Sequence, residues 1–467
     1  MTIYFSFGSA KFCLYDCRMF FGGMAYFNIE IRFKGGKLLS DFKVLRRGDA
    51  GPQVELLQLG LQRAKFDPGS IDGIFGNNTY SALRRFQSSV GLVSDGIAGA
   101  MTWRRLTPYL TGYVTHTIRS GDTFYRIAQN YGTSIRAIET ANPAVDPLNL
   151  VLGSVVTVPL GFEVVPVNIS FTSLVLELSV TGLKKRYPFL ETGSIGRSVM
   201  GKPLYYLKIG AGQNQVFYNA SHHANEWITT PLLMKYLENY SRAFALGGNI
   251  FNTDAASLYN ASSLYIVPMV NPDGVDLVTG ELTSGGYYTR ARGYAANYPN
   301  IAFPNGWKAN IAGVDPNLQY PAGWEQAREI KVAQGYTSPA PRDYVGPAPL
   351  EAPESRAVYD FTLSKNFSLT LSYHTQGKVI YWKYLDYLPE RSFEIAQVFA
   401  SVSGYTLSET PAASAYAGYK DWFISNYNLP GYTIEAGIGT APLPLSQFNN
   451  IYADNEGILT YALTAMI

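Results

Sequence analysis

The second half of the chain contains apolar stretches that each end in polar residues. The stretches are QVFYNASHH (215–223), SSLYIVPMVNPDG (262–274), FSLTLSYHTQG (367–377) and GYTIEAG (431–437). A long amphipathic pattern at 227–245 lies between the first two, and strand and helix patterns alternate onward. This alternation predicts an α/β domain, which we assign to residues 171–467. Because functional side chains in such sheets gather at strand carboxyl ends, we expect the site there.

Two of the four histidines of the chain, His222 and His223, stand together at the end of one such stretch, and Glu226 follows. By itself this motif fits a buried histidine bonded to backbone and a surface glutamate. His374 ends another apolar stretch, however, so two imidazoles and one carboxylate can converge. Two histidines and one carboxylate leave a tetrahedral position open for water, as in catalytic zinc sites. The sequence therefore indicates a zinc site.

A water nucleophile also needs a base, and Glu435 is the candidate. Glu435 ends a third apolar stretch and has apolar neighbours. Apolar surroundings raise the pKa of a carboxyl group, so Glu435 could carry a proton to a leaving amine. The alternative is a glutamate at a strand end that faces solvent.

Six short motifs make this domain resemble the zinc metallocarboxypeptidases of the carboxypeptidase A type. They are HHANEW, NPDG, GVDPN, SYHTQG, KDW and TIEAG, and they occur in the order found in that family. The resemblance implies an α/β fold in which helices flank a mixed sheet. It also implies His223, Glu226 and His374 as the ligands of one Zn²⁺ and Glu435 as the general base.

The same resemblance assigns roles to neighbouring positions. Asp315 would orient His223 through its second ring nitrogen, whereas His222 would not be a ligand, because adjacent strand residues point to opposite faces. Family members carry Asn-Arg after this aspartate, and the arginine binds the terminal carboxylate of the substrate. Here Asn317 is kept as a substrate-binding residue, but Leu318 replaces the arginine. Ordinary removal of C-terminal amino acids is therefore not expected.

A second arginine of the family polarises the scissile carbonyl. Lys308 occupies about that place, with Arg290 and Arg292 upstream as rivals. A lysine offers a point charge that can stabilise an oxyanion. The mobile tyrosine of the family corresponds to Tyr416, as a substrate-binding residue.

The segment 43–110 contains an internal repeat. DGIFGNNT starts at Asp72 and DGIAGAMT at Asp95, and a threonine, Thr79 or Thr102, follows each aspartate by the same interval. The glycines allow tight turns, and the threonines are suited to cap the helices that follow. This segment resembles a three-helix peptidoglycan-binding domain; the alternative is a small helical spacer.

The segment 111–160 has a strand, two short helices and a closing strand, and it resembles a LysM domain, which binds glycans containing N-acetylglucosamine. The resemblance places glycan contacts at Gly121, Asp122 and Thr123 and in the turn at 142–143. For His116, in the opening strand, a surface or packing role is expected. Residues 161–170 form the predicted linker to the large domain.

Composition excludes several classes of function. The net charge is +2 over 467 residues, so no bulk field attracts nucleic acid. The longest apolar runs are too short for a transmembrane helix. Residues 1–42 are unassigned and show no clear signal peptide, and the start could lie at Met19 or Met24. Cys13 and Cys17, four residues apart, lack a nearby histidine and make a poor zinc site.

Two wall-binding modules stand next to a peptidase domain that lacks the arginine for a terminal carboxylate. This combination predicts a murein substrate. The resemblance to the γ-D-glutamyl-L-diamino acid endopeptidase branch implies hydrolysis of the γ-D-glutamyl–diaminopimelate bond of peptidoglycan stem peptides. A metallocarboxypeptidase acting on ordinary peptides and an inactive wall-binding protein are the alternatives. We expect association with the cell wall, or action on wall material during sporulation.

Overall fold

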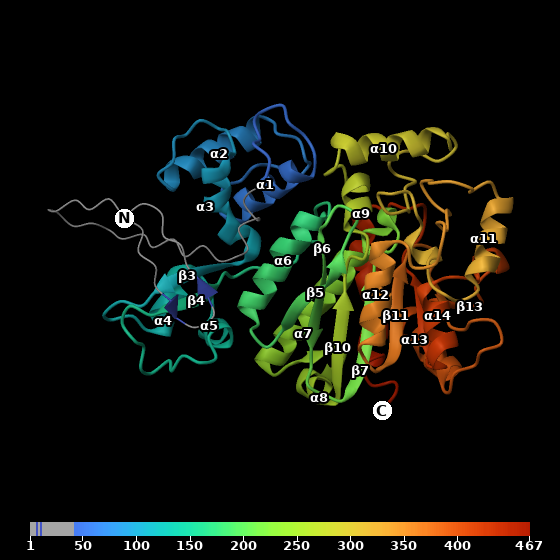
Figure 1. The fold of residues 1–467 in the computed structure, drawn as a ribbon. Helices are drawn as coiled ribbons and strands as arrows, with labels where there is room; N and C mark the ends of the chain where they lie inside the picture. Colours follow the sequence, from blue (N-terminus) through green and yellow to red (C-terminus); the bar gives the residue numbers. More distant parts are fainter. Residues whose placement is uncertain (1–5, 8–9, 12–41) are drawn as a thin grey trace. The chain divides into compact units, whose positions relative to one another are not determined.

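The computed structural model describes residues 6–7, 10–11 and 42–467. The expectations for Cys13, Cys17, Met19 and Met24 lie outside these ranges. The chain forms two compact units, Met1–Asp41 and Phe42–Ile467. In the described part of the first, β1 (Ser6–Phe7) pairs antiparallel with β2 (Ala10–Lys11). The second contains all the predicted modules, drawn in Figure 1, and no helix among the described residues combines the length and apolar character that a bilayer requires.

The helical module consists of α1 (Pro52–Arg63), α2 (Asn77–Ser89) and α3 (Ala100–Thr111), which confirms the three-helix prediction. Its repeated turns are each held by one buried glutamine. The Gln58 amide donates to Asp72 Oδ1 at 2.8 Å and to Thr79 Oγ1 at 3.1 Å. Gln87 repeats this pattern with Asp95 at 2.8 Å and Thr102 at 3.2 Å. The sequence repeat is thus a repeat of one hydrogen-bonded arrangement, in which a glutamine amide donates to an aspartate and a threonine. We call this arrangement the clasp.

The predicted threonine caps are wrong. The helices begin after Gly76 and Gly99, neither of which provides a side-chain cap. Thr79 and Thr102 lie inside the first turns, where their hydroxyls accept from the clasp glutamines instead.

The LysM module has the predicted βααβ order. Its elements are β3 (Tyr113–Thr117), α4 (Phe124–Tyr131), α5 (Ile135–Ala141) and β4 (Val155–Pro159). The two strands pair antiparallel, and the helices pack on them through Ile127, Ile138 and Val156, all fully buried. The linker that follows is pinned to the large domain, because Glu238 accepts from the backbone of Val164 at 2.6 Å and of Val165 at 3.1 Å.

The large domain is built on an eight-stranded sheet of order β13-β12-β14-β11-β7-β10-β6-β5. The strands are β5 (Glu191–Arg197), β6 (Pro203–Ile209), β7 (Asn214–Ala220), β10 (Ser262–Val267), β11 (Phe367–His374), β12 (Val379–Tyr381), β13 (Thr406–Ser408) and β14 (Gly431–Glu435). Strands β10, β7, β11 and β14 are mutually parallel, whereas β6 and β12 pair antiparallel with this group. The predicted mixed sheet is confirmed.

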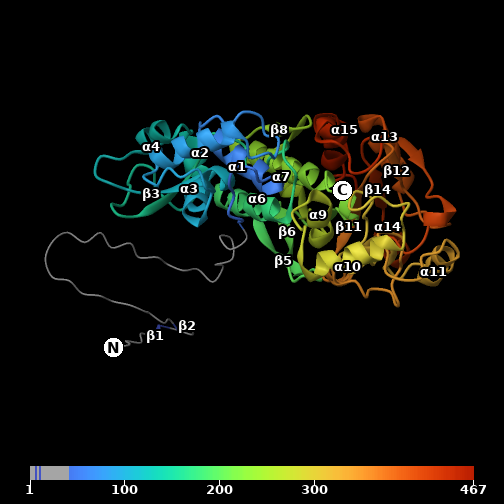
Figure 2. The ribbon, with the colours of Figure 1, turned by 90° about the horizontal axis from the view of Figure 1, so that it is seen from above.

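Helices cover both faces of this sheet. Figure 2 shows α7 (Thr229–Leu246), α13 (Ser392–Ser403) and α15 (Phe448–Tyr461) on one side and α14 (Tyr419–Tyr427) on the other. Consecutive residues of β7 divide between the faces: the Tyr218 hydroxyl donates to the Leu459 carbonyl in α15, whereas the Phe217 ring packs against Tyr419 of α14. α12 (Pro353–Leu363) joins the α14 side through Val358.

The remaining elements lie in the connections of the large domain. They are α6 (Ser173–Arg186), α8 (Ala255–Ala261), α9 (Pro272–Thr279), α10 (Gly285–Ala296), α11 (Trp324–Ala333), the short strands β8 (Asn249–Ile250) and β9 (Thr253–Asp254), and the 3₁₀ turns η1 (Ala224–Glu226), η2 (Pro316–Leu318), η3 (Ala412–Ser414) and η4 (Leu445–Gln447).

A buried carboxylate makes the stability of this domain depend on pH. Glu354 of α12 is fully buried and accepts from the Val199 amide and from Asn310 Nδ2, each at 3.0 Å. Burial raises its pKa to about 7. A carboxyl whose folded pKa exceeds its unfolded pKa stabilises the fold below the unfolded pKa, and that contribution is lost as pH rises through the folded pKa.

We therefore predict that Glu354→Gln removes a pH-dependent part of the unfolding free energy. Between pH 4.5 and 8 the difference between variant and wild type should change by up to about 3 kcal/mol in favour of the variant. Denaturant unfolding at a series of pH values measures this difference. A constant difference across the range would show that Glu354 has the same pKa in the folded and unfolded states.

Candidate metal centre

The carboxyl ends of β7, β11 and β14 bring the predicted site together. After β7 the chain turns at Ser221, whose φ of 53° is left-handed, and its hydroxyl is held by Thr229 at 3.1 Å and Thr230 at 2.8 Å. This turn directs His223 and the 3₁₀ turn with Glu226 over the sheet edge. His374 is the last residue of β11.

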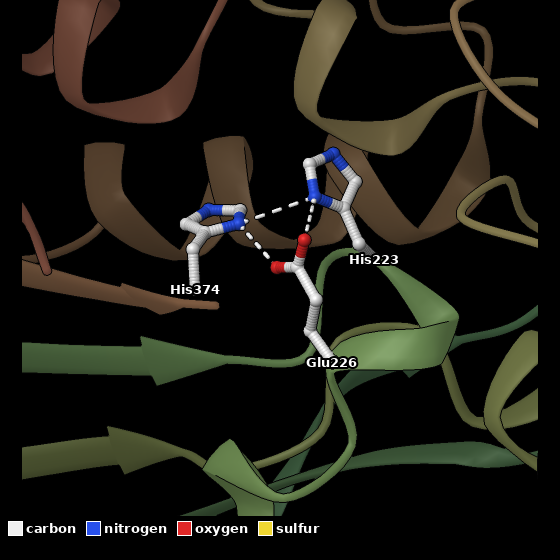
Figure 3. Close-up of side chains that lie close together, drawn as sticks. All are labelled: His223, Glu226 and His374. Atoms are coloured by element: carbon white, nitrogen blue, oxygen red, sulfur yellow. Dashed lines mark hydrogen bonds and ion pairs between the residues drawn. The ribbon is translucent and has the colours of Figure 1, made fainter. Parts of the chain in front are cut away.

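Three side chains present their ligand atoms to one point, as Figure 3 shows. Glu226 Oε1 lies 3.0 Å from His223 Nδ1, and its Oε2 lies 2.8 Å from His374 Nδ1. The two Nδ1 atoms are 3.2 Å apart. Zinc–nitrogen bonds of about 2.0–2.1 Å in tetrahedral geometry place ligand atoms about 3.3 Å apart, so these donors suit zinc in both type and spacing.

Asp315 holds His223 from behind. Its Oδ1 lies 3.2 Å from His223 Nε2, which leaves Nδ1 directed at the cluster. Burial opposes ionisation of Asp315, but the adjacent His223 outweighs it and lowers the pKa of this carboxyl well below its usual range. The structure thus shows the contact expected for the orienting carboxylate.

His222 lies outside the cluster. Its Nε2 is 2.9 Å from the Tyr320 hydroxyl, and the side chain is fully buried. Burial, followed by the charge of His374, lowers the pKa of His222 well below its usual value, so the ring is neutral. The structure separates the two adjacent histidines as the sequence predicted.

Glu435 ends β14, where it pairs in register with His374. Burial, followed by the negative charge of Glu226, raises its pKa to about 8. Lys308 lies on another side of the cluster, with Nζ 2.7 Å from Glu226 Oε1. Both side chains line the same cleft as His223 and His374.

This cleft contains more charged groups than the sequence indicated. Its lining includes Lys308, Asp315, Lys331, Arg342, Asp343, Lys420, Asp421 and Glu435. Lys331, Arg342 and Asp343 were missed because they come from irregular connections with no motif. KDW had marked Lys420 and Asp421 as family residues without giving them a role.

The clamp position is apolar in the structure as well. Leu318 lines the cleft and packs with Trp324, Val345 and Ala417. Asn317 remains beside the cluster, with Nδ2 3.4 Å from His374 Nε2.

The other proposed substrate contacts do not reach the cleft. Tyr416 lines an adjoining hollow and packs against the Leu318 cluster, so the structure does not bring it to the metal ligands. Arg290 and Arg292 lie on α10 and are absent from the cleft lining, and the Arg290 guanidinium stacks over the Tyr287 ring at 4.6 Å. Lys308 is therefore the better placed cation.

The three predicted glycan residues form one tight turn of the LysM module. Gly121 has a φ of 83°, and its carbonyl accepts from Arg126. Asp122 Oδ2 lies 2.8 Å from His116 Nε2, and the Thr123 hydroxyl caps α4. His116 holds this turn, which is a packing role, one of the two roles expected for it.

Comparison with known proteins identifies the modules. The zinc carboxypeptidase family matches residues 177–456, the peptidoglycan binding domain matches 50–106, and the LysM domain matches 116–159. The chain belongs to the zinc carboxypeptidase family. It is a zinc metallopeptidase, as predicted, and its peptidoglycan-binding modules associate it with the cell wall.

Relatives differ in how much of this chain they match. Gamma-D-glutamyl-L-diamino acid endopeptidase 1 of Lysinibacillus sphaericus is 42% identical over 282 residues, which cover 60% of this chain and 69% of that protein. The uncharacterized protein YqgT of Bacillus subtilis is 41% identical over 280 residues, 59% of this chain and 73% of that protein. A spore cortex-lytic enzyme of Bacillus cereus is 39% identical over 103 residues, 22% of this chain and 39% of that protein.

Metal analysis can test the division between the two histidines. We predict that His374→Ala loses bound zinc, because one of three protein ligands is removed, whereas His222→Ala keeps one zinc per folded chain. Elemental analysis of the purified, folded fractions measures both. Zinc loss in the His222 variant, with His374→Ala unaffected, would reverse the assignment.

Proposed function

We propose that this enzyme hydrolyses the γ-D-glutamyl–diaminopimelate bond of peptidoglycan stem peptides while its two modules hold the wall glycan. The observation that carries the proposal is Leu318. A buried leucine in an apolar cluster stands where a carboxypeptidase of this family needs a carboxylate clamp. The similarity to a γ-D-glutamyl-L-diamino acid endopeptidase supports the same bond.

In the proposed mechanism, His223, Glu226 and His374 hold zinc, and Asp315 fixes the ring of His223. When bound, zinc supplies Lewis-acid activation of water and of the scissile carbonyl. Glu435 takes the proton of the attacking water and delivers it to the leaving amine. Its position at the sheet edge and its raised pKa support this role.

Lys308 is proposed to stabilise the negative charge that develops on the carbonyl oxygen. Its ammonium lies beside the cluster, bonded to Glu226, and is 18% exposed toward the cleft. A cation held in place before the reaction stabilises an oxyanion without reorganising during the step. Asn317 is proposed to contact substrate from the side of His374.

The amino-terminal modules are proposed to bring the cleft to its substrate. The turn of Gly121, Asp122 and Thr123 is proposed to contact glycan, and the stem peptide then enters the peptidase cleft. Action on wall material in sporulation fits the similarity of part of this chain to spore cortex-lytic enzymes.

Two other functions remain to be separated by experiment: a metallocarboxypeptidase for ordinary peptides and an inactive wall-binding protein. The apolar Leu318 disfavours the first, and a complete ligand set with Glu435 in the cleft disfavours the second.

A pair of substrates can distinguish the three functions. We predict zinc-dependent cleavage of L-Ala-γ-D-Glu-diaminopimelate and little or no cleavage of hippuryl-Phe, because the latter needs a clamp for its terminal carboxylate. Product analysis with and without a chelator measures both reactions. Cleavage of hippuryl-Phe alone would support the ordinary carboxypeptidase, and cleavage of neither would support the wall-binding protein.

The role of Glu435 can be tested separately from metal binding. Glu435→Gln should lower kcat by at least about 100-fold, because the amide cannot transfer the proton, while the zinc content stays at one per chain. Steady-state kinetics and metal analysis on the same preparation measure both. A variant with normal kcat would mean that another group is the base.

A further inference from the structure

The cleft holds one guanidinium, that of Arg342, whose two terminal nitrogens are not engaged by a carboxylate. Its basic side chains are Lys308, Lys331, Lys420 and Arg342. The three lysines pair in turn with carboxylates of Glu226, Asp343 and Asp421. Arg342 contacts Asp343 through Nε only, at 2.6 Å. Within residues 42–467 its two terminal nitrogens have no hydrogen-bond partner, and its side chain is 41% exposed.

Contacts of the neighbouring residue, Asp343, hold Arg342 in place. Asp343, which accepts from its Nε, has a left-handed φ of 64° and is held from the other side by the buried Lys331 at 2.6 Å. The Asp343 amide donates to Asp315 Oδ2 at 3.1 Å. The Asp343 carboxylate thus holds the guanidinium, and Asp315, which lies against His223, holds the backbone of Asp343.

Arg342 lies on the Lys308 side of the metal centre. The carbonyl of Pro341, its neighbour, accepts from the backbone of Lys308 at 2.8 Å and of Ala309 at 2.9 Å. The Lys420–Asp421 pair follows Tyr419, whose amide donates to Asn317 beside His374. The cleft thus offers a guanidinium near Lys308 and a mutually paired cation and anion near Asn317.

The scissile carbonyl of the proposed substrate belongs to the acyl residue. A cation beside Lys308, the residue proposed to polarise that carbonyl, therefore lies near the acyl residue. A γ-linked D-glutamyl residue carries a free α-carboxylate there, whereas an α-linked acyl residue has no anion at this place. Arginine binds carboxylate with two parallel hydrogen bonds, and both terminal nitrogens of Arg342 are available for this.

On the basis of the proposed function, we propose that Arg342 determines specificity for the γ-linkage. Its terminal guanidinium nitrogens would bind the free α-carboxylate of the γ-D-glutamyl residue. Selection for the γ-linkage then comes from the acyl side of the cleft, and Leu318 only removes the competing preference for a C-terminal carboxylate.

The test compares L-Ala-γ-D-Glu-diaminopimelate with the same peptide whose D-glutamyl α-carboxylate is an amide. Wild type should prefer the free acid in kcat/KM by roughly 10- to 100-fold, the range for hydrogen bonds between charged groups. Arg342→Gln should lose most of this preference and leave the amidated peptide within about threefold of wild type. Arg342→Lys should restore part of the preference, because lysine restores the positive charge but cannot form the two parallel hydrogen bonds of a guanidinium.

A matched control is Arg391, which is also 41% exposed and lies beside Glu394 through its Nε, but does not line the cleft. Arg391→Gln should keep the wild-type preference. The second readout is equilibrium binding of both peptides to Glu435→Gln, with and without Arg342→Gln, where the free acid alone should lose affinity.

Each contrary result has a distinct meaning. A wild type indifferent to amidation, or equal losses on both peptides in Arg342→Gln, would overturn the assignment while leaving the proposed γ-bond specificity intact. Failure of wild type to cleave either peptide would overturn the proposed function and this assignment with it.

Discussion

The register of three parallel strands fixes the geometry of the site. Strand β11 pairs with β7 on one side and with β14 on the other, and these pairings place His374 opposite Glu435. A slip of one residue in any of these strands would turn its last side chain to the opposite face. Almost every side chain of β11 and the last five of β7 are buried, and their packing opposes such a slip, so the core also specifies where the predicted ligands and the proposed base stand.

The charged groups at this edge depend on one another. Glu226 is close to both ligand histidines and to Lys308, and Asp315 is close to His223. An isolated buried charge is costly, whereas opposite charges with good hydrogen bonds compensate each other. Each charged residue of the cluster therefore stabilises the charged form of its neighbours.

The sequence predicted what depends on local pattern. Strand ends located His223, His374 and Glu435, and the repeated turn motif predicted two equivalent turns, although the partner of Thr79 proved to be a glutamine of the preceding helix. The failures involve irregular chain. Arg342 reaches the cleft through contacts of its neighbours with residues far away in sequence, and the loop before α14 turns Tyr416 toward Leu318. No periodicity records such contacts.

Asp315 has a consequence for how this cleft can diversify. One of its oxygens faces His223, a predicted metal ligand, and the other accepts from the backbone amide of Asp343, the residue after Arg342. Substitutions that move Asp315 would disturb metal retention and substrate choice together. New specificities can therefore arise most readily at side chains whose backbone Asp315 holds, such as Arg342, while Asp315 itself stays unchanged.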